Sequence, residues 1–374
     1  MQKLLFCAFC LAITACSSRK TLSPDKDPLT LVIGTYTDTD SKGIYTYRFD
    51  QKTGKSTLLA TTEISNPSYL TASDDGKFIY AVTETDDSTA ALSAFALDQA
   101  TGQLTLLSRQ ATCGGSPCYV ATNGSVALTA NYGGGSMSVF PLERNGAVGA
   151  VDTLFEGSIG GPDADRQSAA HVHCALFSPD HKYIFATDFS ADRIMRFVVH
   201  PRSIVPHRSD ESVAVDSNTG PRHLTFSPNG RFAYLIGELS GMITAFRYDD
   251  GSLQKIQTIT ADTLHARGSA DIRLSPDGKY LYASNRLKGD GIAIFEVNTE
   301  TGMLCKVGYQ HTGVHPRNFN ITPNGKYLLA ACRDDNVIQV FRRDSVSGLL
   351  TDTHQDIRLS KPVCVEFVKP TPTH

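Results

Sequence analysis

The stretch Leu224-Thr-Phe-Ser-Pro-Asn-Gly-Arg-Phe232 decides the fold of this chain, because close copies of it recur along the sequence. Two such copies are Ile272-Arg-Leu-Ser-Pro-Asp-Gly-Lys-Tyr280 and Phe319-Asn-Ile-Thr-Pro-Asn-Gly-Lys-Tyr327. Alternating apolar residues flank an Asp-Gly or Asn-Gly turn in each, which is the strongest short-range signal for a β-hairpin. The equivalent turn residues along the chain are Gly76, Gly124, His181, Gly230, Gly278 and Gly325. The chain is therefore predicted to be a series of repeated hairpins.

The strands on the two sides of these turns form two sets of equal size. Strands before a turn are predicted at residues 68–73, 118–122, 173–178, 222–227, 270–275, 317–322 and 363–368. Strands after a turn are predicted at residues 30–36, 77–84, 125–132, 182–189, 231–238, 279–286 and 326–333. The chain begins with a strand of the second set, residues 30–36, which has no strand of the first set before it. It ends with a strand of the first set, residues 363–368, which has no strand of the second set after it. We expect residues 363–368 to pair with residues 30–36, which removes the exposed sheet edges.

Together these strands predict an all-β, seven-bladed β-propeller over residues 29–368, with no second domain. Third strands follow in each repeat, and a Gly turn follows most of them. The repeat that starts at His173 differs from the others, because His200-Pro201-Arg202 replaces the turn glycine after its third strand. A long insertion at residues 157–170 precedes it, and long loops on a rigid scaffold are often functional.

Composition supports a globular protein and excludes one class of partner. The 374 residues are 41% hydrophobic and 20% charged, with a net charge of -3. This near-neutral balance gives no electrostatic reason to bind nucleic acid. The absence of tryptophan argues against the common propeller repeat with a Trp-Asp signature. A monomer is expected.

The first residues have the pattern of a targeting segment. Lys3 is followed by an apolar run that is too short to span a membrane and ends in Ile13-Thr-Ala-Cys16. This ending resembles the cleavage box of bacterial lipoproteins, which implies lipid attachment at Cys16; an ordinary secretory signal is the alternative. Residues 1–20 are thus predicted to be the signal and lipid-attachment region, and residues 21–28 a tether. The protein is expected to be exported and lipid-anchored in the bacterial envelope, or cytoplasmic if this interpretation is wrong.

The cysteines give little further information. None of the pairs after the signal has the C-x-x-C spacing of a zinc or redox site. Cys113 and Cys118 bracket a turn and could form a disulfide in an oxidising compartment. The other thiols are expected to pack as small hydrophobic groups.

One end of the propeller channel is predicted to be strongly basic. In antiparallel hairpins the start of the strand before the turn and the end of the strand after it lie on the same face. Across four consecutive repeats these positions hold His173, Arg222, Glu238, Arg286, Arg317 and Arg333. An excess of guanidinium groups suits an anionic ligand, since Arg binds carboxylate or phosphate in a bidentate fork. The alternative is a set of structural ion pairs between blades.

These residue types fit acyl transfer to water. His173 is the natural general base because the usual pKa of a histidine is about 6.5. Arg222 or Arg286 would stabilise the developing oxyanion, and Glu238 would orient the histidine or act as a second base. A covalent serine mechanism is unsupported, because the chain has no Gly-x-Ser-x-Gly. A metal at His171 and His173, or calcium at Asp38 and Asp40, lacks the further ligands it would need.

The chain resembles a known family on several motifs. They are Gly34-Thr-Tyr-Thr37, His171-Val-His173, Asp192-Arg193, Gly220-Pro-Arg-His223, Glu238, Ser284-Asn-Arg286, Pro316-Arg317-x-Phe319 and Pro362-Val-Cys364. In this order they resemble the propeller-type 6-phosphogluconolactonases, which are related to fungal carboxy-muconate lactonizing enzymes. The resemblance covers residues 29–368, and Gly-Pro-Arg-His followed by Glu238 is its most specific part.

The resemblance implies hydrolysis of 6-phospho-glucono-lactone to 6-phosphogluconate with no metal or cofactor. It implies catalytic roles for His173, Glu238, Arg222 and Arg286, with His171 as a possible substitute for His173. The substrate-binding residues expected around them are His171, Arg317, Arg333, Asp188, Asn285 and His223. The related cycloisomerase shows that this fold does not settle the reaction.

The expected export conflicts with that substrate, because a phosphorylated sugar lactone is a cytoplasmic metabolite. An exported relative would instead open an unphosphorylated lactone, or only bind a ligand or protein. Both alternatives remain open at the level of sequence.

Overall fold

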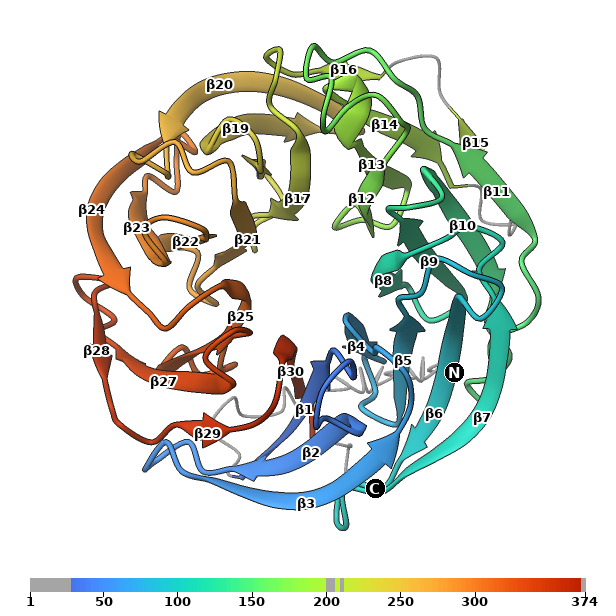
Figure 1. Cartoon of the computed structure of the whole chain (residues 1–374). Helices are drawn as coiled ribbons and strands as arrows, with labels where there is room; N and C mark the ends of the chain where they lie inside the picture. Colours follow the sequence, from blue (N-terminus) through green and yellow to red (C-terminus); the bar gives the residue numbers. More distant parts are fainter. Residues whose placement is uncertain (1–27, 200–205, 209–211, 371–374) are drawn as a thin grey trace, which may run out of the picture.

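Seven β-sheets surround a central channel in the computed structural model of the chain, which describes residues 28–199, 206–208 and 212–370. The sheets are arranged as the blades of a propeller (Figure 1). The predicted fold class is confirmed. We number the blades 1 to 7, so that blade 1 contains β4 to β7 and blade 7 contains β30 and β1 to β3.

The two strands of each blade that lie nearest the centre of the ring are those that the repeat predicted. The innermost strands line the channel and are β4 (Leu70–Ala72), β8 (Pro117–Thr122), β12 (Val172–Phe177), β17 (Pro221–Phe226), β21 (Ser269–Leu274), β25 (Pro316–Ile321) and β30 (Pro362–Val368). The second strands are β5 (Phe78–Thr83), β9 (Val126–Asn131), β13 (Tyr183–Asp188), β18 (Phe232–Gly237), β22 (Tyr280–Asn285), β26 (Tyr327–Cys332) and β1 (Leu29–Thr35).

Two further layers complete each blade. The third strands are β6 (Ala91–Leu97), β10 (Ser136–Pro141), β14 (Arg193–Val198), β19 (Met242–Asp249), β23 (Gly291–Val297), β27 (Val337–Arg343) and β2 (Gly43–Phe49). The outermost strands are β7 (Leu104–Ala111), β11 (Thr153–Glu156), β15 (His207–Arg208), β16 (Val213–Ala214), β20 (Ser252–Thr260), β24 (Leu304–His311), β28 (Leu350–Asp352), β29 (Ile357–Arg358) and β3 (Ser56–Glu63). Within the described residues the helical structure is a 3-10 turn, η1 (Phe189–Ala191). No described helix is long and apolar enough to pass through a membrane.

The ring closes as the sequence predicted. The C-terminal strand β30 pairs antiparallel with β1, from Thr30 opposite Val368 to Gly34 opposite Cys364. Figure 1 shows the two strands side by side, at opposite ends of the colour scale. Because β30 is the inner strand of blade 7, the ends of the chain seal the propeller.

The side chains of the repeated motif explain its turns. In Ser227-Pro-Asn-Gly the Ser227 hydroxyl donates to Asn229 Oδ1 at 2.7 Å and accepts the Phe232 amide at 2.9 Å. The equivalent hydroxyls of Ser73, Ser178, Ser275 and Thr322 accept the corresponding amide in their own turns. The turn therefore fixes the register of the two strands, which makes residue counting from it reliable.

The start of the inner strands carries a second repeated feature. In five blades it consists of a residue with positive φ, a proline and then a residue at the channel mouth. These triplets are Asn66-Pro-Ser68, Ser116-Pro-Cys118, Gly220-Pro-Arg222, His315-Pro-Arg317 and Lys361-Pro-Val363. In the second, third and fourth of them the strand register shifts at the mouth residue. Such bulges redirect a side chain, here toward the channel.

One alternative from the sequence concerns a disulfide, and three predictions concern residues that lie largely outside the described chain. Cys113 and Cys118 are free thiols, one exposed and one buried, so the disulfide considered above is not formed. The lipid-attachment residue Cys16 and nearly all of the tether lie outside the described residues, as does His200-Pro201-Arg202.

Candidate active site

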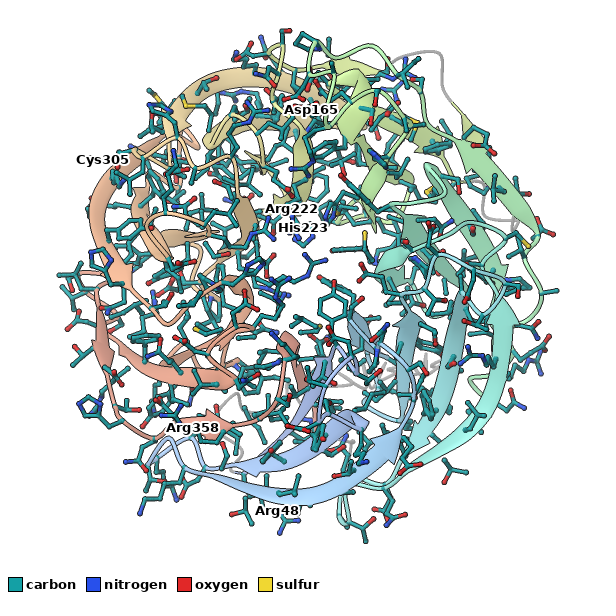
Figure 2. All side chains as sticks on the ribbon, in the orientation of Figure 1. Arg48, Asp165, Arg222, His223, Cys305 and Arg358 are labelled. Carbon is teal, nitrogen blue, oxygen red and sulfur yellow. The ribbon has the colours of Figure 1, made fainter. Side chains whose placement is uncertain are left out.

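The channel mouth contains the predicted cluster of charged side chains. Arg222 follows Pro221 at the start of β17, and Glu238 directly follows β18 of the same blade. Since Pro221 is opposite Gly237, the hairpin places the two side chains together. Figure 2 shows Arg222 and its neighbour His223 reaching toward the centre of the ring.

Glu238 is held by three guanidinium groups. Arg222 Nε donates to Oε2 at 2.8 Å, Arg286 Nη2 lies 3.3 Å from the same oxygen, and Arg166 Nη2 donates to Oε1 at 2.8 Å. Burial alone would raise the pKa of this carboxyl, but Arg286, Arg222 and Arg166 lower it to about 2. Glu238 is therefore an anion whose oxygens are already paired, which makes it a poor general base.

A histidine and an aspartate support Arg222 from below. Arg222 Nη1 donates to the Ala270 carbonyl at 2.7 Å and lies 3.2 Å from His223 Nε2. His223 Nδ1 lies 2.8 Å from Asp271 Oδ1. We assign the Nδ1–H tautomer, because a carboxylate can only accept and the guanidinium can only donate. Burial and Arg222 lower the pKa of His223 to about 4, so its ring is neutral at pH 7.

Arg286 has a matching support on blade 6. Its Nη1 lies 3.2 Å from His315 Nε2, and His315 Nδ1 lies 3.2 Å from Arg333 Nη2 and 3.3 Å from Asp334 Oδ2. Burial and the cations Arg286 and Arg333 lower the pKa of His315 to about 3. Asp271, His223 and Arg222 thus form a hydrogen-bonded chain that ends on Glu238 Oε2. Arg286 reaches the same oxygen, and the histidine behind it, His315, lies between Arg286 and Arg333.

Arg222 and Arg286 differ in how many of their guanidinium nitrogens already have a partner in the protein. Arg286 Nε also donates to the Gly268 carbonyl at 2.7 Å, and Nη2 contacts the Ser269 carbonyl, so all three of its nitrogens are engaged. Arg222 Nη2 has no partner among the described residues and is not sealed from solvent. Arg222 can therefore donate to a ligand in the mouth while Arg286 holds Glu238.

The long insertion, residues 157–170, supplies Arg166 from above. The backbone amide of Arg166 donates to Asp163 Oδ1 at 2.9 Å, and Arg267 of the loop before β21 forms an ion pair with Asp163. Gln167 ties the loop to blade 3 through Asp192 Oδ1 at 2.9 Å. The side chain of Arg166 is 38% exposed and that of Arg222 is 2% exposed, so Arg166 lies at the rim of the mouth and Arg222 lies deeper.

The two candidate bases, His171 and His173, occupy different levels. His173 is buried, with its ring centre 5.3 Å from that of His223 and Nδ1 3.7 Å from Cys118 Sγ. Burial, Arg222, His223 and Arg317 hold its pKa well below the usual value. His173 Nε2 has no partner among the described residues and is not sealed from solvent.

His171 lies at the rim and is also well oriented. Its ring stacks on Tyr132 with centres 4.1 Å apart, and Nδ1 lies 2.7 Å from the Tyr132 carbonyl oxygen. Because a carbonyl only accepts, Nδ1 carries the proton and Nε2 presents its lone pair.

A second cluster lies across the mouth on blades 6, 7 and 1. Tyr36 Oη donates to Glu84 Oε2 at 3.0 Å, and Arg317 Nη2 lies 3.9 Å from the same oxygen. The guanidinium of Arg317 also lies over the Tyr36 ring, 5.5 Å from its centre.

The remaining predicted ligand-binding residues are engaged with the protein. Asp334 occupies the fork of Arg333 with contacts of 2.9 Å to Nε and to Nη2. Asp188 is fully buried and accepts from Arg193 and Ser158, which fixes the base of the insertion. Asn285 is buried between Ser269 and the Ala261 carbonyl. We therefore assign positioning roles to Asp188, Asn285 and His223.

Residue counting missed Arg166 and His315, and gave Glu84 no role. The sequence did mark the insertion, in which Arg166 is the basic residue. His315 stands before Pro316-Arg317 as Gly220 stands before Pro221-Arg222. Among the described residues no group of three or more His, Cys, Asp or Glu side chains is arranged to hold a metal ion.

Comparison with known proteins matches the whole ring. A profile of the lactonase family, described as a 7-bladed β-propeller, matches residues 30–367. A 6-phosphogluconolactonase of Formosa agariphila is 34% identical, over 87% of this chain and 96% of the relative. A 6-phosphogluconolactonase of Bacillus subtilis is 32% identical, over 90% of this chain and 97% of the relative.

Solved structures agree. A crystal structure from Bacteroides uniformis, provisionally assigned as a 6-phosphogluconolactonase, is 67% identical with a TM-score of 0.91, covering 92% of this chain and 100% of that one. The periplasmic gluconolactonase of Pseudomonas aeruginosa is 31% identical with a TM-score of 0.87, covering 92% of this chain and 100% of that one.

Proposed function

This chain belongs to the family of seven-bladed β-propeller lactonases, and from that premise we propose that it hydrolyses a sugar lactone of the gluconolactone type. One observation carries the proposal. His173 Nε2 and Arg222 Nη2 are both without a partner among the described residues and neither is sealed from solvent. The two side chains are neighbours through His223, whose ring centre lies 5.3 Å from that of His173 and whose Nε2 lies 3.2 Å from Arg222 Nη1. A base for water and a donor for an oxyanion are what hydrolysis of a carbonyl ester requires.

In the proposed reaction water attacks the lactone carbonyl carbon. His173 Nε2 accepts a proton from the water as the new C–O bond forms. The carbonyl oxygen becomes an oxyanion, which Arg222 Nη2 stabilises. The bond to the ring oxygen then breaks, the ring oxygen takes the proton from His173, and an open-chain hydroxy acid results. His171 is the second candidate for the base, because its Nε2 also presents a lone pair.

Glu238 is assigned a positioning role in this reaction. It fixes Arg222 through Nε and leaves Nη2 for the substrate. The excess of guanidinium groups around Glu238 also favours the carboxylate that the reaction produces.

The first substrate to consider is 6-phospho-glucono-lactone, the substrate implied by the names of the curated relatives. One observation favours an unphosphorylated lactone as a second candidate. Arg333, an expected substrate-binding residue that could hold a phosphate, already has its fork filled by Asp334. The name of the Pseudomonas aeruginosa structure supports this candidate.

An exported, lipid-anchored form remains part of the proposal. The pattern ending in Cys16 supports it. An exported enzyme would meet unphosphorylated sugar lactones.

The test is a hydrolysis panel on the protein without residues 1–20. It should contain glucono-lactone with and without a 6-phosphate, each measured against the rate in buffer. At least one should open faster with protein, and His173→Ala should abolish the acceleration. If neither lactone opens faster than in buffer, the proposed function is wrong. Activity that depends on an added metal ion would overturn the mechanism.

A further inference from the structure

The cluster of Glu84, Arg317 and Tyr36 is not used by the mechanism above. These residues come from blades 1, 6 and 7, and they meet at the mouth through contacts of 3.0 Å and 3.9 Å to the same Glu84 oxygen. Because three blades contribute, the ring closure by β30 is needed to assemble the cluster.

Arg317 has more unused hydrogen-bonding capacity than the other mouth arginines of the inner strands. Its side chain is only 15% exposed, yet it makes no hydrogen bond with any described residue. None of its nitrogens is both buried and unpaired. Its unpaired N–H groups are therefore accessible to solvent.

Glu84 presents an acceptor beside these donors. Its Oε2 receives the Tyr36 hydroxyl, whereas its Oε1 has no partner among the described residues and is not sealed from solvent. A guanidinium donor and a carboxylate acceptor thus lie side by side and open, with the Tyr36 ring next to them.

The donor groups of Arg317 beside the acceptor oxygen of Glu84 indicate which kind of ligand group can bind there. A phosphate group would gain from Arg317 but would meet the charge of Glu84. A pair of neighbouring hydroxyl groups suits both, because one oxygen accepts from the guanidinium and the other hydroxyl donates to the carboxylate. A few fixed polar groups of this kind set the orientation of a ligand in its pocket.

We propose that Glu84, Arg317 and Tyr36 form a hydroxyl-binding subsite that recognises two neighbouring hydroxyl groups of the sugar lactone. The proposal rests on the proposed function for the identity of the sugar. It assigns specificity to blades 6, 7 and 1, separate from the reacting groups on blades 3 and 4.

The test compares glucono-δ-lactone with δ-valerolactone, which has the same ring without hydroxyl groups. Glu84→Ala should lower kcat/KM for glucono-δ-lactone about tenfold to a hundredfold, mainly through KM, because a charged hydrogen bond is lost. It should change kcat/KM for δ-valerolactone less than about twofold, because that ring offers no hydroxyl to the subsite. Glu143→Ala, an exposed carboxylate, is the matched control. Equal losses on both lactones would overturn the proposal.

Two further measurements separate the possible failures. The effect of Glu84→Ala should be the same with and without a 6-phosphate; a selective gain with the phosphorylated lactone would assign Arg317 to phosphate and contradict the subsite. Calorimetric binding of gluconate is independent of turnover, and Glu84→Ala should weaken it about tenfold or more. Such weakening without lactone hydrolysis would disprove the proposed function but support the subsite. Unchanged gluconate binding would disprove the subsite.

Discussion

Glu84 and Glu238 occupy the same position of the repeat, eight residues after the turn glycines Gly76 and Gly230, yet their surroundings are opposite. Three guanidinium groups hold Glu238 and no oxygen is left open. One phenol hydroxyl and a more distant guanidinium approach Glu84, whose second oxygen faces the mouth. The repeat therefore places a carboxylate at the channel mouth in both blades. The side chains from neighbouring blades decide whether that carboxylate holds arginines in position or is open to a ligand.

Removing Arg222 should produce the largest effect on activity. Arg222→Ala deletes the proposed oxyanion donor and should lower kcat/KM about a thousandfold, because loss of one such donor costs about 10²–10³ in kcat. Arg222→Lys keeps the charge but loses the fork, and should recover only part of the rate. Lactone hydrolysis at matched folded concentration, with exposed Arg247→Ala as control, measures this. Activity of Arg222→Ala near wild type would remove Arg222 from the mechanism.

The Glu238 environment should appear as acid sensitivity of folding. Its folded-state pKa of about 2 lies below the ordinary 4.5, so its ionised form favours folding above about pH 4.5. This contribution is lost as the pH falls through about 2, and it amounts to about 3 kcal/mol because one pKa unit is about 1.4 kcal/mol. Denaturant titrations should show that Glu238→Gln removes most of this pH dependence. Glu84→Gln should leave it in place; a similar loss in both variants would abolish the contrast.

His223 should act in a neighbouring pH window. Its folded-state pKa of about 4 lies below the ordinary 6.5, so the unfolded chain takes up the proton first as the pH falls. Its contribution to stability is present above about pH 6.5 and is lost between about 6.5 and 4, up to about 3 kcal/mol. His223→Asn should flatten the stability profile in that window. The exposed His265→Asn is the control, and an unchanged slope in His223→Asn would contradict the neutral assignment.

Arg166 should affect catalysis more than stability. Arg166→Gln removes a guanidinium that is 38% exposed, and Arg222 and Arg286 still hold Glu238, so the unfolding free energy should fall by less than about 1 kcal/mol. Its loss at the rim should lower kcat/KM about tenfold, with exposed Arg144→Gln unchanged. Parallel denaturation and kinetics decide this, and a large stability loss without a kinetic effect would make Arg166 purely structural.

The smallest change concerns Tyr36. Tyr36→Phe removes the hydroxyl that donates to Glu84 Oε2 but keeps the ring under Arg317. One neutral-to-charged hydrogen bond at a part-open site should cost about 1 kcal/mol, so KM for glucono-δ-lactone should rise about fivefold while kcat is retained. A fall in kcat with unchanged KM would place Tyr36 among the reacting groups instead.

By itself the sequence determined the seven blades, the seal between β30 and β1, and the group His173, Arg222, Glu238 and Arg286 at one mouth. These follow from hairpin turns, whose side chains fix the register locally, so counting from Gly230 or Gly278 finds the mouth positions.

Only the tertiary structure decided how the charges are paired. Arg166 reaches Glu238 from an insertion 72 residues away, His315 supports Arg286 from the next blade, and Asp334 occupies Arg333. Arg317 and Glu84 meet only because the ring closes. Electrostatic and hydrogen-bonding partners depend on distances between blades, which no local pattern encodes. Which guanidinium is free and which carboxylate is open is therefore a property of the assembled ring.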